Sequence, residues 1–255
     1  MKPIKLTLLA LVWVVSATVV CPAQTLYFPQ VANGISGGVV WKTTMFLTNP
    51  AGPGGPLANG VITFTKDSPF NSFDLSTPGL PFNIAVVDEA GQPVGSGNTV
   101  PFQIAPGQSR KFVSTGAGQY SGAFASISSS APVSGTAIFS EFDSGGRLIG
   151  EAGVPAAVAV PRQTIFVDTT GGFQIGVAYA NPGSSAVPLT LSLLNSAAEV
   201  VRSTPQVLGP GNHNAAFTFQ LFSGAPPLEG TMQITSASPL KALALRFDSP
   251  SSVFT

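Results

Sequence analysis

Residues that could carry out catalysis are few in this sequence. Residues 34–38, GISGG, match the G-x-S-x-G pattern of a nucleophile elbow, in which a serine stands on a sharp strand-to-helix turn. The residues that follow, VVWKTT, are β-branched or aromatic with one exception and predict a strand where the elbow needs a helix. His213 is the only histidine and lies in a GPGNHN turn, so we predict an exposed turn residue and no Ser–His triad.

The acidic residues do not show the spacing of a known metal site. Calcium loops place carboxylates at alternate positions before a glycine, and zinc sites need several Cys or His at short spacing. Five carboxylates lie instead beside turn residues: Asp88, Glu89, Glu141, Asp143 and Asp168. We therefore predict solvated turns, no metal and no cofactor. An alternative stays open, in which Glu141, Asp143 or Glu151 supplies the carboxylate pair of a glycoside hydrolase.

Aromatic side chains are the remaining candidates for binding, because planar rings stack on sugars. Tyr120 stands near two glycines, and Phe70 and Phe73 lie in a long stretch without strand pattern. These three are the candidate ligand-binding residues. Trp41 and Tyr179 share a strand face with apolar neighbours, so we expect both in the core.

The composition is that of an uncharged, turn-rich β protein. Hydrophobic residues make up 44% of the 255 and charged residues only 9%, against about 25% in an average soluble domain. Basic and acidic residues number 11 each, so there is no excess of positive charge to bind nucleic acid. The 28 Gly and 23 Pro disfavour long helices and favour short strands joined by turns.

Residues 1–23 have the pattern of a cleaved signal peptide. Lys2 and Lys5 precede an uncharged apolar run at 6–20, and small residues permit cleavage after Ala23. The apolar run is short for a membrane span, which needs about 20 residues. We predict export to the periplasm, cell surface or medium, with acylation of Cys21 as a lipoprotein the minor alternative.

Landmarks recur in the same order along the chain and predict a duplicated unit. Residues 131–139, APVSGTAIF, return as 238–247, SPLKALALRF, and Asn-Pro and Pro-Gly turns also occur twice. We expect 123–127 and 231–235 each to form a hairpin with the strand after the following proline. We also align the turn region at 84–94 with that at 191–201.

This pattern predicts an all-β chain with two tandem immunoglobulin-like antiparallel β-sandwich domains. The first would span 25–153, with an insertion at about 51–83 that contains an exposed aromatic loop. A semi-rigid linker at 154–162, possessing edge-strand character, would join it to the second domain at 163–255.

The arrangement of these landmarks also resembles a recurrent class of exported β-repeat proteins of environmental bacteria. The segments that carry the resemblance are YFPQVANG, WKTTMFLTNP, VVDEAGQPV, APGQ, APVSGTAIF, EAGVP, GVAYANP and SPLKALALRF. The resemblance implies export and β architecture, but no activity and no site residues.

The function that these observations favour is a non-enzymatic interaction or adhesion module outside the cytoplasm. Its partners would be extracellular glycans or proteins. Two alternatives remain: a glycoside hydrolase, and an assembly subunit that exchanges a strand at a sheet edge through residues 154–160.

Overall fold

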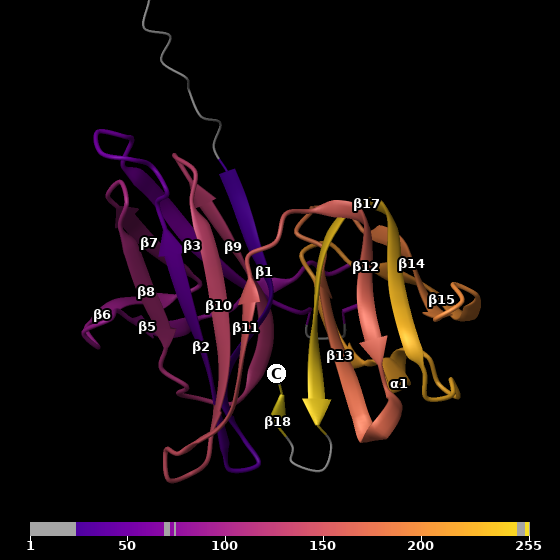
Figure 1. Cartoon of the computed structure of the whole chain (residues 1–255). Coiled ribbons are helices and arrows are strands. Elements are labelled where there is room, and N and C mark those ends of the chain that lie inside the picture. Colours follow the sequence, from indigo (N-terminus) through magenta and orange to yellow (C-terminus); the bar gives the residue numbers. More distant parts are fainter. Residues whose placement is uncertain (1–23, 69–71, 74, 249–252, 255) are drawn as a thin grey trace, which may run out of the picture.

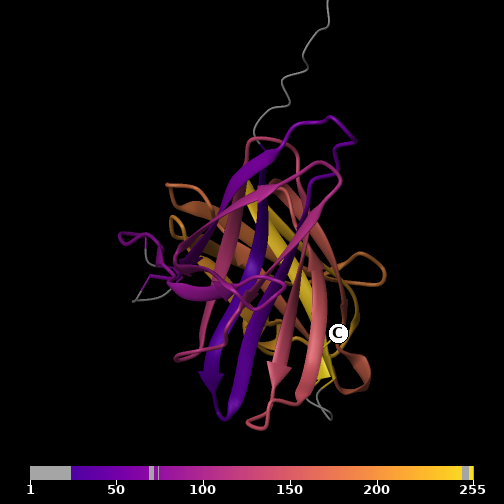
Figure 2. The ribbon, with the colours of Figure 1, turned by 90° about the vertical axis from the view of Figure 1, so that its left-hand side faces the viewer.

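The computed structural model describes residues 24–68, 72–73, 75–248 and 253–254. Their strands form two antiparallel β-sandwiches that stand side by side, with β1 and β11 of the first facing β17 of the second (Figure 1). Figure 2 looks onto the first sandwich with the second behind it. The predicted all-β fold with two sandwiches is confirmed. The predicted signal peptide lies outside the described residues.

The first sandwich comprises β1 (Gln24–Ser36), β2 (Val39–Thr48), β3 (Ala58–Lys66), β4 (Leu80–Pro81), β5 (Ile84–Val87), β6 (Pro93–Gly97), β7 (Thr99–Ile104), β8 (Ser109–Ser114), β9 (Ser121–Ser129), β10 (Ser134–Phe142) and β11 (Leu148–Pro155). The second comprises β12 (Val160–Asp168), a 3₁₀ turn (Thr170–Gly172), β13 (Phe173–Ala180), β14 (Val187–Asn195), β15 (Val200–Leu208), β16 (His213–Phe217), α1 (Thr218–Leu221), β17 (Glu229–Asp248) and β18 (Val253–Phe254). Alternating apolar residues build each core, as in β7, where Val100, Phe102 and Ile104 are buried and their neighbours exposed.

The two sandwiches repeat one order of strands. The layer β1–β9–β3–β7 corresponds to β12–β17–β14–β15, and the layer β11–β10–β2–β8 corresponds to β18–β17–β13–β16. Strands β5 and β6 extend the second layer of the first sandwich only. Without the outer strands β11 and β18, the seven remaining shared strands form layers of four and three, the numbers found in immunoglobulin constant domains. Here, however, the first strand pairs with the sixth, and the seventh pairs with the second.

Two asparagines make the duplication visible in hydrogen bonds. The side-chain amide of Asn49 donates to the carbonyl of Ile104, and that of Asn181 donates to the carbonyl of Leu208. The first bond spans 55 residues and the second 27. Both asparagines are buried at the end of equivalent strands, β2 and β13. The predicted alignment of the two Asn-Pro landmarks is therefore confirmed.

The expected hairpins at 123–127 and 231–235 are wrong. Strand β9 pairs with β1 and β3 in one layer, whereas β10 pairs with β2 and β11 in the other. The connection between them crosses the sandwich, with Ala131 and Val133 buried in the core. In the second sandwich the same crossing occurs within β17 itself, around Pro239, where neither neighbouring layer requires a backbone N–H.

The insertion lies later in the chain than predicted. Strand β3, inside the predicted segment 51–83, has a counterpart in β14, because each pairs with the strand that precedes the crossing. The segment without a counterpart is 67–98, which contains β4, β5 and β6. In the second sandwich β14 and β15 are joined directly by a short turn. The predicted alignment of 84–94 with 191–201 is also wrong, because 84–94 lies in the insertion, whereas 191–201 belongs to β14 and β15.

The connection between the sandwiches is held against the first one. Strand β11 continues to Pro155, and Ala157 exchanges two backbone hydrogen bonds with Tyr27, of 2.8 and 3.1 Å. Val160 then begins β12 opposite Leu240. This segment has the edge-strand character that its sequence predicts, and its backbone is paired within the chain.

Strand β17 gives side chains to both cores. Leu243, Leu245 and Phe247 pack against the core of the first sandwich, while Ala242 and Ala244 pack against that of the second. The preceding Lys241 is 1% exposed, and its ammonium lies 3.6 Å from the ring centroid of Tyr27. The two sandwiches therefore share a packed interface.

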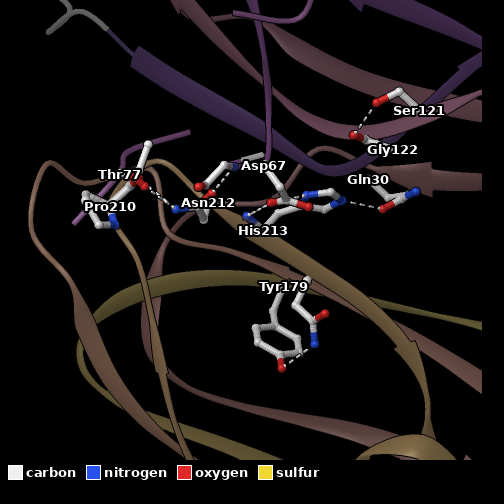
Figure 3. A network of polar contacts seen from close by, with 11 residues as sticks. Gln30, Asp67, Thr77, Ser121, Gly122, Tyr179, Pro210, Asn212 and His213 are labelled. Carbon is white, nitrogen blue, oxygen red and sulfur yellow. Dashed lines mark hydrogen bonds and ion pairs between the residues drawn. The ribbon is translucent and has the colours of Figure 1, made fainter. Parts of the chain in front are cut away.

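A second contact comes from the insertion, which reaches the Pro-Gly turn of the second sandwich (Figure 3). We call its described residues 67–68, 72–73 and 75–79 the clamp. The N–H of Gly79 donates to the carbonyl of Pro210 at 2.9 Å, and Oδ1 of Asn212 accepts from the N–H of Ser68 at 2.7 Å. A Cβ on Gly79 would lie 1.8 Å from the carbonyl oxygen of Gly211, so only glycine fits there.

Candidate functional site

The sequence pattern of a nucleophile elbow does not form the elbow geometry. Ser36 ends β1, and Gly37 and Gly38 turn the chain directly into β2. His213 is 3% exposed, which corrects the prediction of an exposed turn residue. Its ring nitrogens face Asp67 at 2.9 Å and Gln30 at 3.1 Å (Figure 3). The imidazole thus takes part in the contact between the two sandwiches.

Asp88, Asp143 and Asp168 lie at turns, as the sequence predicts, but Glu141 does not: it lies within strand β10, partly buried, and lines a pocket. Asp88 accepts hydrogen bonds from the N–H groups of its own hairpin turn, and Asp143 does the same. These backbone bonds and the Arg147 guanidinium lower the pKa of Asp143, while the hydroxyl and N–H of Thr170 lower that of Asp168. Across the described residues no group of three or more His, Cys, Asp or Glu is placed to hold a metal ion.

A cleft of about 660 Å³ lies between the two sandwiches. Its size is within the roughly 300–1,000 Å³ of small-molecule sites. One wall comes from β1, β2 and β10 and the segment before β9, and the other from β13, β16, α1 and β17. The interface at β17 and the clamp fix the distance between these walls. The cleft is therefore a product of the docking and belongs to neither sandwich alone.

Trp41, Tyr120 and Glu141 form the polar and aromatic part of the first wall. Trp41 on β2 is directly opposite Glu141 on β10, which places both side chains on one face of the layer. The Tyr120 ring lies 5.7 Å from that of Trp41 at an angle of 59°. Gly34 permits this placement, because a Cβ there would lie 2.4 Å from the carbonyl oxygen of Gln119.

The second wall presents two more rings and several amides. Phe217 and Phe247 meet edge to face, with centroids 5.0 Å apart. Gly176 on β13 leaves room for them, since a Cβ at that position would lie 3.0 Å from the Phe247 ring. Gln174 and Gln220 line the same side, and Gln30 lines the first. The cleft thus combines aromatic faces with neutral hydrogen-bonding groups.

Glu141 brings a carboxylate with a shifted pKa into the cleft. Burial raises the pKa of its carboxyl above the ordinary value of 4.5. Burial also raises the pKa of Tyr120 above 10.0, and the charge of Glu141 adds to that effect. The phenol and the carboxyl are therefore close enough to influence each other in a partly desolvated site.

Of the three candidate binding residues, the structure places only Tyr120 in the cleft. Tyr120 lines the cleft and is 39% exposed. Phe73 is exposed in the clamp, away from the residues that line the cleft, and Phe70 lies outside the described residues. Tyr179 is fully buried, as predicted, and its hydroxyl donates to Gln206. Trp41, expected in the core, is only half-buried: it packs against the edge of the first core and also lines the cleft.

Apart from Tyr120 and Glu141, the residues that line the cleft were not predicted as part of a site. Glu141 was considered with Asp143 and Glu151, yet Asp143 is in a turn and Glu151 accepts a hydrogen bond from Ser140 at 2.9 Å. The carboxylate that does share the cleft with Glu141 is Asp248. Glu141 and Asp248 come together only because the two sandwiches pack against each other, and no local sequence pattern predicts that packing.

Comparisons with protein-family models, with curated proteins and with solved structures find no match. In the part of the chain that the structure describes, no helix has the length and apolar character to cross a membrane. The function has to be argued from the cleft itself.

Proposed function

We propose that the chain is an exported, non-enzymatic interaction module that binds an extracellular ligand, such as a glycan, in the cleft between its two sandwiches. The observation that carries the proposal is the cleft of about 660 Å³ with Trp41 and Tyr120 on one wall and Phe217 and Phe247 on the other. Ring faces and amide groups together suit ligands with both apolar and hydroxyl-bearing surfaces. Export is supported by the sequence of residues 1–23.

Fluorescence offers a direct test, because Trp41 is the only tryptophan after residue 23. A glycan array probed with the chain from residue 24 onward identifies ligands, and titration of each one follows Trp41 emission. We expect saturable binding that Tyr120→Ala weakens about tenfold, equivalent to roughly 1.4 kcal/mol. Phe166→Ala is the matched control, because Phe166 is 62% exposed on β12 and does not line the cleft.

Two results would count against binding in the cleft. One is an affinity that Tyr120→Ala and Phe166→Ala change equally. The other is the absence of any ligand that alters Trp41 emission while the array still reports binding, which would place the binding surface elsewhere.

A glycoside hydrolase remains the second candidate because Glu141 and Asp248 line the same cleft. The raised pKa of Glu141 suits a general acid, which must hold its proton until the glycosidic oxygen takes it. Release of product from aryl glycosides by purified protein, abolished by Glu141→Gln, would replace the binding proposal with this one. Unchanged turnover in that variant would indicate a contaminating enzyme.

Export itself needs an independent experiment. Protease treatment of intact cells, followed by fractionation, separates surface display from periplasmic retention and release. A chain that remains in the cytoplasm with residues 1–23 attached would contradict the exported location.

A further inference from the structure

The described lining of the cleft has negative charge without any positive charge. Glu141 stands on the first wall and Asp248 on the second, and none of the described residues that line the cleft is Lys or Arg. Lys42 follows Trp41 along β2, but alternation points it to the other face, where its ammonium lies over the Phe142 ring. The potential inside the cleft therefore favours a cation.

Glu141 lacks the partners that other carboxylates of the chain possess. Asp143 pairs with Arg147 at 3.0 Å, and Asp168 pairs with Arg246 at 3.1 Å. Within the described part of the chain, no hydrogen bond or ion pair reaches the carboxylate of Glu141. Burial that disfavours its charge would be offset by a positive group in the cleft.

Two aromatic rings lie beside this carboxylate in the lining of the cleft. The Trp41 and Tyr120 rings are inclined at 59° with centroids 5.7 Å apart, and Glu141 lies opposite Trp41 on the neighbouring strand. Tryptophan and tyrosine are the side chains whose faces attract cations most strongly, over distances up to about 6 Å. Two such rings next to a carboxylate provide both kinds of group that attract an ammonium ion.

We propose that the cleft binds a ligand bearing an organic ammonium group, which rests on the Trp41 and Tyr120 faces against the carboxylate of Glu141. This deepens the proposed function by naming the ligand class, and it depends on binding in the cleft. The volume of about 660 Å³ leaves room for the rest of the ligand, which the amides of Gln30, Gln174 and Gln220 can bind by hydrogen bonds.

Choline and 3,3-dimethylbutan-1-ol form a matched pair of probes, because they share one shape and differ in the charge of a single atom. Each is titrated into the chain from residue 24 onward, with Trp41 emission and calorimetry as readouts. We expect choline to bind at least about tenfold more tightly than its neutral isostere. In Glu141→Gln this preference should fall severalfold, while Phe166→Ala should retain it in full.

The outcomes separate this inference from the function on which it rests. Equal affinity for the two probes, or a choline preference that survives in Glu141→Gln, overturns the ammonium site. A neutral glycan that alters Trp41 emission while choline does not bind overturns the inference and leaves the proposed function standing. If no glycan, choline or isostere binds at all, both are overturned. Circular dichroism of Glu141→Gln confirms that a loss reflects the missing charge and not unfolding.

Discussion

Nδ1 of His213 lies 2.9 Å from Oδ1 of Asp67, although the two residues are 146 positions apart and belong to different sandwiches. The same carboxylate oxygen accepts the backbone N–H of His213 at 2.7 Å. One oxygen atom of the clamp thus fixes both the ring and the backbone of the first residue of β16.

Asp67→Ala should destabilise the chain by about 1–3 kcal/mol, because it leaves the N–H of a buried residue without its acceptor. The measurement is the free energy of unfolding in urea. A double-mutant cycle with His213→Ala should give a coupling energy of at least about 0.5 kcal/mol. Strictly additive effects would show that the two residues do not stabilise each other.

Gly79→Ala should open the clamp. The new methyl group would meet the carbonyl oxygen of Gly211, and the bond from Gly79 to Pro210 could not form. We expect faster amide hydrogen exchange at residues 79, 209 and 211–213 and easier proteolysis between 67 and 79. Gly97→Ala is the control, because no atom lies within 4 Å of the Cβ it would add. Equal exchange in the two variants would contradict the close approach.

Lys241 should make stability depend on alkaline pH. Burial lowers its pKa from 10.5 to about 8 in the folded chain. Between these values the unfolded chain binds more protons than the folded one, so the contribution of Lys241 to stability rises with pH. Below about pH 8 the folded state carries the whole penalty, at most about 3 kcal/mol and reduced by the contact with Tyr27.

The comparison that isolates this group is with Lys241→Met, which keeps the length of the side chain and removes its charge. The free energy of unfolding of the original chain, relative to the variant, should increase from about pH 7 to about pH 10. Parallel stability curves across this range would mean that the ammonium is not desolvated at the interface.

Binding of choline should weaken as the pH falls through the raised pKa of Glu141, because the carboxyl then becomes neutral. Two other titratable side chains line the cleft. Tyr120 has a pKa above 10.0 and stays neutral throughout. Asp248→Asn should keep the pH dependence, whereas Glu141→Gln should remove it. A profile that follows Asp248 instead would assign the charge recognition to the second wall.

The features predictable from the sequence are those that depend on local pattern. Alternation along β2 and β13 places Met45, Leu47, Val177 and Tyr179 in the cores, where the structure has them. The Asn-Pro landmarks mark the ends of equivalent strands, because each asparagine side chain donates to the last carbonyl of an equivalent strand, β7 or β15. Composition and turn residues were enough to predict an all-β fold.

The features that the sequence left undetermined depend on contacts between distant segments. A proline between two strands indicates a break, but it does not distinguish a hairpin from a crossing between layers. The burial of Ala131 and Val133 shows that the connection crosses the core. The cleft depends on a register that pairs Trp41 with Glu141 and on a second wall from the other sandwich. Neither leaves a short-range signal.

The shared strand β17 also constrains how the duplicated halves can change. Its odd-numbered residues Leu243, Leu245 and Phe247 complete one core, and its even-numbered residues Ala242 and Ala244 complete the other. A substitution at Leu243, Leu245 or Phe247 must therefore be compatible with the core of the other sandwich, whose described residues lie at positions 26–154. We therefore expect the two halves, produced as separate fragments, to need co-expression to become soluble.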